Sequence, residues 1–464
     1  MKAKIEKALS EYWESSGKNQ HSKGREMSGY RAYWDKELET MPREKLKAYQ
    51  FQLLKENIDL AYHKSPYYKR HFREAGVAPF HLESVEDLKK FPTIDKKVLR
   101  SQQEICPDFG DLTCAPEEDF VFLSASSGST GVPTASPFTG KDFEAFQDCE
   151  ARLFWSSGMR PTDRYCHALN FTLFVGGPDV IGAMKLGALT IWAGTIPSER
   201  LLSIFQTWKP TVTWTTPSYA WYLGETAKEA GINVADLAIN KIFVAGEPGG
   251  SIPETRQSIE ELWNADVYDY YGLSDIFGAC AAMCEAKEGL HWAEDHILVE
   301  VVDPKTGEEV PEGERGEMIL TSLKKEARPL IRFRTGDIVS YTTEKCRCGR
   351  THMRLDGIHG RLDDMMIIKG VNVFPSDIET IVRNNPKLTG EYVCVITEEK
   401  HMAVLTVEVE KQDDFDGEES ELIAEVQNEC KKIIGIKPRV DVLTSKSIAR
   451  ATHKAKRVRD ERKK

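Results

Sequence analysis

The stretch S-A-S-S-G-S-T-G-V-P-T-A-S-P, from Ser124 to Pro137, is the part of the sequence that indicates the fold most directly. It follows an apolar run at residues 121–124, which we predict as a strand, and it precedes a helix predicted to begin near Thr139. Glycine lets backbone N–H groups approach an anion closely, and the serine and threonine hydroxyls add further donors. The stretch is therefore either a cradle for phosphate groups or a small-residue linker.

The spacing of the stretch excludes a P-loop of the Walker type. That loop needs two glycines separated by four residues and followed by a lysine that reaches the terminal phosphates. Here only two residues separate Gly128 from Gly131, and no lysine follows. The remaining candidates for phosphate binding are the hydroxyls and glycines of the stretch itself, namely Ser126, Ser127, Gly128, Ser129, Thr130 and Gly131.

The composition is that of an ordinary globular protein. The 464 residues are 41% hydrophobic and 29% charged, so we expect two or three folded domains and no extensive disorder. A net charge of −11 argues against a general affinity for nucleic acid or anionic lipid. The basic end, residues 454–464, is the exception, and nucleic-acid binding through it is a disfavoured alternative.

Neither a secretory signal nor a membrane span is expected. Charges interrupt the first 20 residues, and the longest apolar stretch, residues 173–192, contains Asp179 and Lys185. Ten cysteines without an export signal are typical of a reducing compartment. We therefore predict a cytoplasmic protein whose cysteines are thiols or metal ligands.

The pattern of apolar runs predicts an α/β protein. The first part, residues 1–115, is largely helical, and from Phe120 short apolar runs alternate with amphipathic segments, as in βαβ units on a largely parallel sheet. After about Gly289 the pattern changes to an antiparallel meander. We predict a large N-terminal domain, residues 1–362, and a small mobile α+β domain, residues 363–464.

The phosphate-loop candidate resembles that of the adenylate-forming superfamily, which includes acyl-CoA synthetases, luciferases and non-ribosomal adenylation domains. Further segments follow in the order that this family requires. They are AGEPGG (Ala245–Gly250), YYGLSD (Tyr270–Asp275), FRTGD (Phe333–Asp337), GRLDD (Gly360–Asp364) and ARATHKAKR (Ala449–Arg457). Because the motifs are ordered, they favour a phosphate cradle over a linker far more strongly than the loop alone.

Within the superfamily the sequence is most similar to phenylacetate-CoA ligases. Segments such as SPYYKRHFREAGV, GLHWAEDH and GRLDDMMIIKGVNVFPSDIE carry this resemblance, which runs from about Tyr33 to Arg459. It implies an AMP-forming aryl-acid CoA ligase that uses ATP, Mg²⁺ and coenzyme A, and we also expect a homodimer. Phenylacetate is the leading substrate, followed by indoleacetate or another aryl acid.

The resemblance also assigns the nucleotide site. The opening loop would hold the β- and γ-phosphates, Tyr271 would lie against adenine, and Ser274 would meet the α-phosphate. Asp275 stands where the family has a magnesium-binding glutamate, and it is one methylene shorter. Further nucleotide-binding candidates are Gly246, Glu247, Pro248, Gly272 and Asp337, the last of which would accept hydrogen bonds from the ribose hydroxyls. The alternatives are a helix N-cap for Asp275 and a β-turn role for Asp337.

In the C-terminal part, Lys454 is the predicted adenylation residue, since its ammonium would bridge the carboxylate and the α-phosphate. The family's usual glycine before this lysine is His453 here. The alternative is a solvated basic helix end. Asp363 matches the hinge about which the small domain rotates, Arg361 would touch the nucleotide, and residues 369–375 would belong to the face used with CoA.

Aromatic side chains are the candidates for the acid pocket. They are Phe171, Phe174, Trp214 and Tyr219, which lie in predicted loops and strand ends. Aromatic residues at such positions are as often plain core as substrate wall.

Three cysteines and a histidine form a predicted zinc site. Cys284 and His291 have the pattern C-x₆-H, and Cys346 and Cys348 have the pattern C-x-C. Three thiolates and one imidazole make a closed tetrahedral set of the structural type. The alternatives are unconnected thiols, or a set in which Cys280 replaces Cys284.

Two rival functions remain open at this stage. The first is a synthetase of the same fold that leaves AMP on its product, as in the deazaflavin type. The second is a non-catalytic nucleotide-binding relative, which is suggested by the departures at Asp275 and His453.

Overall fold

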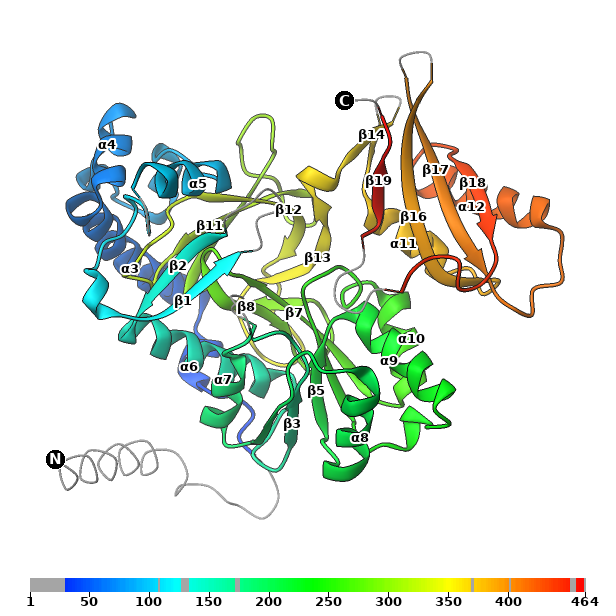
Figure 1. Cartoon of the computed structure of the whole chain (residues 1–464). Helices are drawn as coiled ribbons and strands as arrows, with labels where there is room; N and C mark the ends of the chain where they lie inside the picture. Colours follow the sequence, from blue (N-terminus) through cyan, green and yellow to red (C-terminus); the bar gives the residue numbers. More distant parts are fainter. Residues whose placement is uncertain are drawn as a thin grey trace.

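The computed structural model describes residues 30–462 apart from 107–108, 127–132, 172–175, 369–370, 400–401 and 451–455. Its main element is an eleven-stranded sheet with the order β10-β11-β12-β13-β9-β8-β7-β6-β5-β3-β4 (Figure 1). Parallel strands form one half of this sheet and antiparallel strands the other half. The predicted α/β class is therefore confirmed.

The N-terminal part is helical, as predicted. Its elements are α2 (Lys36–Glu39), α3 (Arg43–Lys64), α4 (Pro66–Glu74), η1 (Pro79–His81), η2 (Val85–Lys90), α5 (Lys96–Ile105) and η3 (Glu117–Asp119). On α3, Leu54 and Ile58 are one turn apart and fully buried. The Asn57 side chain donates to the carbonyl oxygen of Ser322, which ties α3 to the antiparallel half of the sheet.

The predicted phosphate loop is flanked by two paired strands, β1 (Phe120–Ser126) and β2 (Thr134–Thr139). The sequence predicted β1 as part of the parallel sheet and a loop leading directly into the next helix. Both predictions are wrong, because β2 pairs antiparallel with β1 in a separate two-stranded sheet and is buried along its whole length. The helix α6 (Gly140–Ser156) begins where predicted, and the Thr139 hydroxyl caps it by accepting from the Asp142 N–H.

The parallel half contains β3 (Arg164–His167), β4 (Leu189–Trp192), β5 (Val212–Thr215), β6 (Lys241–Val244) and the first part of β7 (Asp266–Leu273). Its helices are α7 (Asp179–Leu186), α8 (Ser198–Trp208), α9 (Pro217–Glu229), η4 (Val234–Asp236) and α10 (Pro253–Trp263). Helices α6 and α7 pack on one face of the sheet and α8 to α10 on the other, so two apolar clusters form, one on each side (Figure 1).

The antiparallel half follows. It consists of β8 (Phe277–Met283), β9 (Leu290–Trp292), β10 (Ile297–Val302), β11 (Gly316–Ser322), β12 (Phe333–Thr342) and β13 (Arg354–Arg361). The predicted pair of runs after Gly289 corresponds to β10 and β11, which are antiparallel neighbours. The meander is therefore confirmed.

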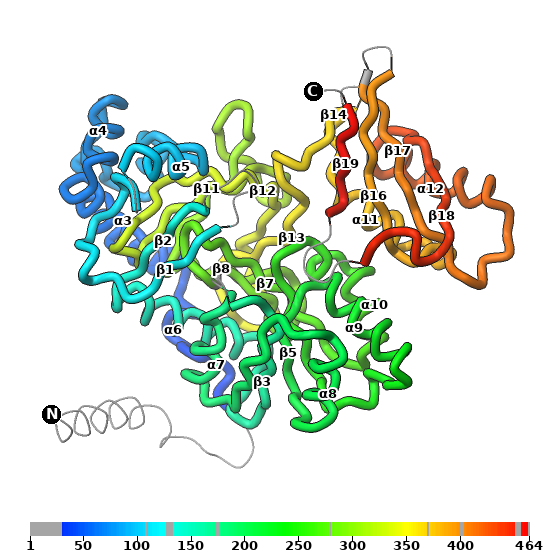
Figure 2. Tube along the Cα trace, viewed as in Figure 1, coloured from blue at the N-terminus to red at the C-terminus, as the bar shows by residue number. Residues whose placement is uncertain are grey.

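The C-terminal part has an apolar core of its own, from Met366 to Val440. Its elements are η5 (Leu362–Asp364), β14 (Met366–Ile368), β15 (Val371–Val373), α11 (Pro375–Arg383), β16 (Leu388–Glu399), β17 (Met402–Lys411), α12 (Glu419–Ile433), β18 (Arg439–Leu443) and β19 (Val458–Asp460). It stands beside α9 and α10 in the chain trace (Figure 2). The domain boundary at residues 362/363 stays a prediction.

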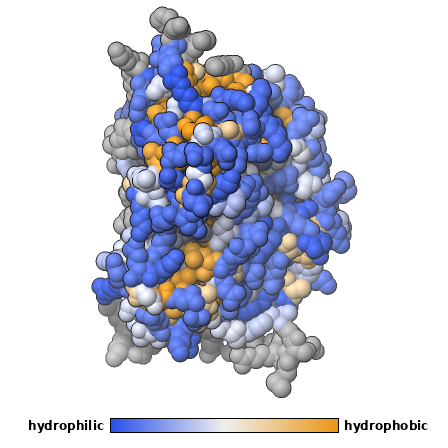
Figure 3. Space-filling view, turned by 90° about the vertical axis from the view of Figure 1, so that its right-hand side faces the viewer, coloured by the Kyte–Doolittle hydropathy of each residue, from blue (hydrophilic) through white to orange (hydrophobic). Residues whose placement is uncertain are grey.

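The face of the molecule that carries the C-terminal part is mostly hydrophilic, with small apolar patches (Figure 3). In the part of the chain that the structure describes, no helix is both long and apolar enough to cross a membrane.

Candidate active site

Asp275 lies in the turn between β7 and β8 and is almost completely buried. Its Oδ1 accepts a hydrogen bond from Thr134 Oγ1 at 2.9 Å, and its Oδ2 lies 3.2 Å from Lys96 Nζ. The Thr134 hydroxyl also contacts the Ser126 hydroxyl across the β1–β2 pair. Asp275 is therefore joined to the base of the predicted phosphate loop. The helix N-cap alternative is wrong, because β8 and not a helix follows Asp275.

Two further basic side chains lie near Asp275. Lys325 is buried, and its Nζ donates to Ser136 Oγ at 2.7 Å on β2. Burial holds the pKa of Lys325 well below its usual 10.5. Arg328 donates from Nη2 to the carbonyl oxygen of Asp275 at 2.8 Å. Arg328 and Lys96 thus concentrate positive charge where phosphate oxygens are predicted to bind, and Lys325 adds a buried amine donor.

Sequence reasoning missed Lys96, Lys325 and Arg328. Lys96 is the first residue of α5 and directly follows the N-cap residue Asp95. Lys325 and Arg328 lie in the segment between β11 and β12. None of the three belongs to one of the recognised motifs, so no local pattern points to them.

Tyr271 and Asp337 lie together, as the nucleotide-site prediction requires. The Tyr271 hydroxyl donates to Asp337 Oδ2, and Arg361 Nη1 donates to Asp337 Oδ1 at 2.9 Å. Burial, and then the negative charge of Asp337, raise the pKa of Tyr271 well above 10. Arg361 also contacts Asp363 at 3.3 Å, so one guanidinium joins the predicted ribose carboxylate to the predicted hinge.

The turn alternative for Asp337 fits only in part. Asp337 lies within β12 and directly follows Gly336, whose φ of +76° is the left-handed conformation that glycine adopts most readily. The Asp337 N–H donates to Thr335 Oγ1 at 3.0 Å. A local turn is thus present, and it directs the carboxylate toward Tyr271 and Arg361.

The remaining nucleotide candidates lie at or just after the carboxyl ends of β6 and β7. Gly246 has φ +92°, Glu247 accepts from the Ser218 N–H at 2.7 Å, and Pro248 is exposed. Gly272 belongs to β7, and the carbonyl oxygen of Ser274 accepts from Ser124 Oγ at 3.0 Å. Ligands commonly bind outside the carboxyl ends of parallel strands, so the position of this loop fits the prediction.

Several predicted residues lie outside the described part of the chain. They are Ser127, Gly128, Ser129, Thr130, Gly131, Phe174, His453 and Lys454.

The segment that precedes Lys454 is held by a buried carboxylate, Glu410 of β17. Glu410 accepts from Arg450 Nη1 at 2.9 Å, from the Lys446 N–H at 3.2 Å and from the Ile448 N–H. Arg450 also reaches Glu225 of α9, with 3.3 Å between Nε and Oε2. This segment is therefore fixed both to its own core and to the N-terminal part.

The predicted acid-pocket residues do not all come together. The Phe171 ring lies 4.9 Å from the ring of His167, and Trp214 lies 6.3 Å from the same ring. Tyr219 packs in the other apolar cluster, on the far side of the sheet, where its hydroxyl contacts Ser198. Phe171 and Trp214 thus share one site, and the structure does not bring Tyr219 to it, because Tyr219 belongs to α9, which packs on the other face of the sheet.

The predicted zinc ligands do converge. The ligand atoms of Cys284, His291, Cys346 and Cys348 all lie within 4.8 Å of one another. Cys284 Sγ is 3.7 Å from Cys346 Sγ, and Cys348 Sγ is 3.3 Å from His291 Nε2. A tetrahedral ion with Zn–S bonds of 2.3 Å requires S···S edges of about 3.8 Å, so the donor set fits zinc. Cys280 is not part of this set.

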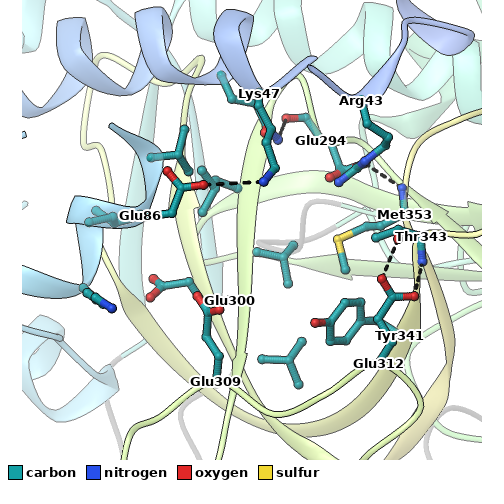
Figure 4. Close-up of a pocket in the computed structure, with 17 residues that line it drawn as sticks. Arg43, Lys47, Glu86, Glu294, Glu300, Glu309, Glu312, Tyr341, Thr343 and Met353 are labelled. Carbon is teal, nitrogen blue, oxygen red and sulfur yellow. Dashed lines mark hydrogen bonds and ion pairs between the residues drawn. The ribbon is translucent and has the colours of Figure 1, made fainter. Parts of the chain in front are cut away.

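A pocket of about 220 Å³ lies apart from these residues, between α3, η2 and the strands β10 and β12. Ion pairs cross it, from Lys47 to Glu86 and from Arg43 to Glu294 (Figure 4). Of the predicted site residues that the structure describes, none lines this pocket.

Comparison with known families agrees with this geometry. Residues 69–323 match the family described as AMP-binding enzyme, and residues 370–462 match the AMP-binding enzyme C-terminal domain. A phenylacetate-coenzyme A ligase from Thermus thermophilus is 37% identical over 82% of this chain and 84% of its own length. Another from Aromatoleum evansii is 36% identical over 92% and 96%, respectively.

Solved structures of one relative also match. A 2-hydroxyisobutyryl-CoA ligase in its postadenylation state superimposes with a TM-score of 0.88 at 33% identity, covering 94% of this chain and 93% of that one. In its thioesterification state, with CoA, the TM-score falls to 0.71 at 34% identity and 93% coverage of both chains. The predicted fold and family are confirmed: the chain belongs to the AMP-binding, adenylate-forming enzymes, in their phenylacetate-coenzyme A ligase branch.

Proposed function

We propose that this ATP-dependent acid–CoA ligase acts on an aryl acid of the phenylacetate type. The acid carboxylate attacks the α-phosphorus of ATP and releases pyrophosphate, and the CoA thiol then attacks the acyl adenylate and releases AMP. Two groups of contacts carry the proposal. Asp275 contacts Lys96 and Thr134 at the base of the β1–β2 loop, where the phosphates would bind. Tyr271 contacts Asp337, where the nucleoside would bind. The names of the similar ligases support the acid.

The reaction needs positioning and charge neutralisation more than covalent help. The loop between β1 and β2 would hold the β- and γ-phosphates, with Ser126 at its edge. Lys96 and Arg328 would add positive charge to the phosphates. Tyr271 would lie against adenine, with Gly246, Glu247, Pro248 and Gly272 around it. Asp337 would accept from the ribose hydroxyls, while Ser274 would meet the α-phosphate.

Asp275 is the candidate magnesium ligand. A buried carboxylate is a hard oxygen donor of the kind that magnesium prefers, and both of its oxygens face polar groups of the site. Magnesium bound there would neutralise the charge that develops as pyrophosphate leaves. Lys454 would bridge the attacking carboxylate and the α-phosphate, and Glu410 would position it by fixing the preceding segment.

The C-terminal domain would rotate between the two half-reactions. The higher TM-score against the postadenylation state of the relative supports the idea that the present arrangement belongs to that stage. Rotation about Asp363 would replace the Lys454 segment by residues 369–375 when CoA enters. Arg361 would release Asp363 while it keeps its contact with Asp337.

The cysteine and histidine set would hold a structural zinc ion. Cys284 follows β8, His291 lies in β9, and the other two ligands precede β13, so the ion would fasten the turns of three strands together. The homodimer and the cytoplasmic location stay predictions.

A screen of pyrophosphate release tests the proposal. We expect release from ATP only when phenylacetate or a related acid is present, and formation of acyl-CoA and AMP only when CoA is added. Turnover without CoA that yields a stable adenylylated product would favour the synthetase that retains AMP. If no acid in a broad panel releases pyrophosphate, the non-catalytic alternative gains support.

A further inference from the structure

Several buried polar atoms between α6, α7 and the parallel strands have no hydrogen-bond partner among the described residues. They are both carboxyl oxygens of Glu150, Oδ1 of Asp179, both amide atoms of Gln147, Nε2 of His167 and Nε1 of Trp214. Burying such atoms without a partner destabilises a fold, and most of all where the group is charged. A concentration of unpartnered atoms in one layer of a folded enzyme therefore points to a ligand that completes it.

Two of these residues face each other across the contact between α6 and α7. A Cβ atom at Gly182 would lie only 2.6 Å from Cβ of Glu150, so the absence of a side chain lets the helices approach at this point. Asp179 lies three residues before Gly182 on the same face of α7. Burial, and then the charge of Asp179, raise the pKa of Glu150 well above 4.5. The two carboxyl groups thus form a buried acidic pair, and no described cation forms an ion pair with either.

The acidic pair adjoins the predicted acid pocket through Tyr165 and His167. A Cβ atom at Gly176 would lie 3.7 Å from Asp179 Oδ2 and 3.7 Å from Leu169 Cδ1, so this carboxyl borders the segment that follows β3. After burial itself, the charges of Asp179 and Glu150 contribute most to the raised pKa of Tyr165 on β3. The Tyr165 hydroxyl lies 2.7 Å from His167 Nδ1, and Phe171 packs on the His167 ring. His167 lies at the carboxyl end of β3, beside Trp214 of β5, which is where α/β sheets bind ligands.

The chemistry of the layer limits the ligand. A carboxyl group keeps at least one accepting oxygen whether or not it carries a proton, so the Glu150 and Asp179 atoms call for a hydrogen-bond donor or a cation. A metal ion is not favoured, since the cysteine and histidine set is the one described group that brings three or more ligand atoms close together. Burial lowers the pKa of His167 to about 3, so the ring is neutral and does not neutralise the pair.

We propose that Glu150 and Asp179 close the far end of the acid pocket and select aryl acids that carry a hydrogen-bond donor, a hydroxyl or an ammonium group, on the ring. This inference rests on the proposed function and narrows its substrate class. A site built to bind a polar substituent discriminates strongly against the analogue that lacks it, because its buried polar groups then stay unpaired.

The first experiment compares acids on the wild-type enzyme. Pyrophosphate release with ATP, Mg²⁺ and CoA is measured for phenylacetate, for 3- and 4-hydroxyphenylacetate, and for 3- and 4-(aminomethyl)phenylacetate. We expect kcat/KM to be at least about 10-fold higher for one of the donor-bearing acids than for phenylacetate. The two kinds of substituent distinguish a neutral hydroxyl from a cation.

The second experiment uses variants that keep the shape of the pocket. Glu150→Gln and Asp179→Asn should lower the ratio of kcat/KM for the preferred acid to kcat/KM for phenylacetate by about 10-fold or more, so that the preference shrinks. Glu300→Gln is the control, since Glu300 is a buried carboxylate on β10 that pairs with Arg332 away from this layer. A purely structural effect would lower the rates for both acids by the same factor.

The outcomes distinguish a failure of this inference from a failure of the proposed function. Turnover of phenylacetate at least as efficient as that of every donor-bearing acid would overturn this inference and leave the proposed function intact. Unchanged preference in both Glu150→Gln and Asp179→Asn would do the same. Failure of every acid, with and without CoA, would overturn the proposed function together with this inference.

Discussion

Lys96 Nζ lies 3.2 Å from Asp275 Oδ2, so the carboxylate proposed to bind magnesium already faces a cation from α5. The Asp275 side chain is almost completely buried and the Lys96 side chain is about two-thirds buried. Their mutual attraction is therefore stronger than that of an exposed pair. The same ammonium would lie next to incoming phosphates. Lys96 therefore has two partners that compete for it, one in the protein and one in the substrate.

The Lys96→Met variant distinguishes the contact with Asp275 from the contact with the phosphates. We expect kcat for adenylation to fall about 10- to 100-fold, because the phosphate charge loses a neutralising group. The Mg²⁺ concentration for half-maximal rate should fall, since no cation competes for Asp275. A magnesium titration of pyrophosphate release measures both. The control is Lys97→Met, an exposed neighbour, and an unchanged rate in Lys96→Met would contradict the role.

Asp337→Asn and Tyr271→Phe test the proposed ribose site. The asparagine keeps the shape but loses the charge that Arg361 contacts. We expect a loss of about 10- to 100-fold in kcat/KM for ATP, as for a lost hydrogen bond to a charged group. Tyr271→Phe keeps the aromatic ring, so its loss should be smaller. Steady-state kinetics at varied ATP gives both values, and equal effects on the acid and on ATP would argue against a ribose contact.

The ion pairs between α9 and the C-terminal domain should stabilise the present arrangement. Glu225 contacts Arg450, and Glu229 contacts Lys446 at 2.7 Å. The Glu229–Lys446 pair is exposed, and such pairs contribute about 0.2–1 kcal/mol, so its loss should change the population at most about fivefold. The Glu225–Arg450 pair is partly buried. Glu225→Gln with Glu229→Gln should speed the reaction of preformed acyl adenylate with CoA, as should 0.5 M salt on the wild type.

Single-turnover measurements of the two half-reactions check this prediction. Lys228→Gln, on the same helix, serves as the control. If the double variant slows the CoA step, or if salt has no effect on it, the ion pairs do not hold the arrangement.

Removal of the proposed zinc ion should affect stability more than chemistry. Wild-type protein should contain about one zinc per chain, and Cys346→Ser should lose it and unfold at a temperature several degrees lower. The activity per folded enzyme at 25 °C should change little, because the ligands lie away from Asp275 and Asp337. Metal analysis and thermal unfolding are the measurements, with Cys106→Ser as the control at an exposed thiol. A zinc content well below one per chain in the wild type would refute the site.

Asp269 gives the fold a defined dependence on pH. Burial raises the pKa of this carboxyl to about 7 from an ordinary value of 3.8, although Ser251 donates to it. Because the folded state holds the proton more tightly than the unfolded chain, the free energy of unfolding should fall as the pH rises from about 4 through 7. The full effect is at most about 4 kcal/mol.

Asp269→Asn should remove this dependence, since the amide does not ionise. Denaturant unfolding at pH 5 and pH 8 measures the difference between wild type and variant, with Asp413→Asn as an exposed control. A variant that loses as much stability as the wild type between these values would contradict the assignment.

Local sequence predicted the nucleotide-site candidates Tyr271, Asp275 and Asp337, because each belongs to a short motif whose residues are adjacent in the chain. The structure brings Tyr271 of β7 into contact with Asp337 of β12, and their role in binding stays a prediction. The start of α6 near Thr139 could also be predicted from neighbouring residues alone. A threonine followed three residues later by an acidic residue is a sequence pattern typical of a helix N-terminus.

Other features depended on contacts between distant segments. The β1–β2 pair was missed because strand pairing depends on partners, and β2 is a short run with little alternation. The aromatic candidates were ambiguous for the same reason. Trp214 and Tyr219 are both aromatic candidates in the sequence, and only the fold decides that Trp214 of β5 and Tyr219 of α9 pack in different apolar clusters, on opposite faces of the sheet.

By itself, the sequence of this protein determined its family, its α/β class, the order of its nucleotide motifs and the cysteine and histidine set that converges in the structure. The tertiary structure decided which charges meet, such as Lys96 with Asp275 across 179 residues and Glu150 beside Asp179 between two helices. The physical reason is that spacing along the chain reports local backbone geometry, whereas the environment of a buried charge is created by segments that come together only when the chain folds.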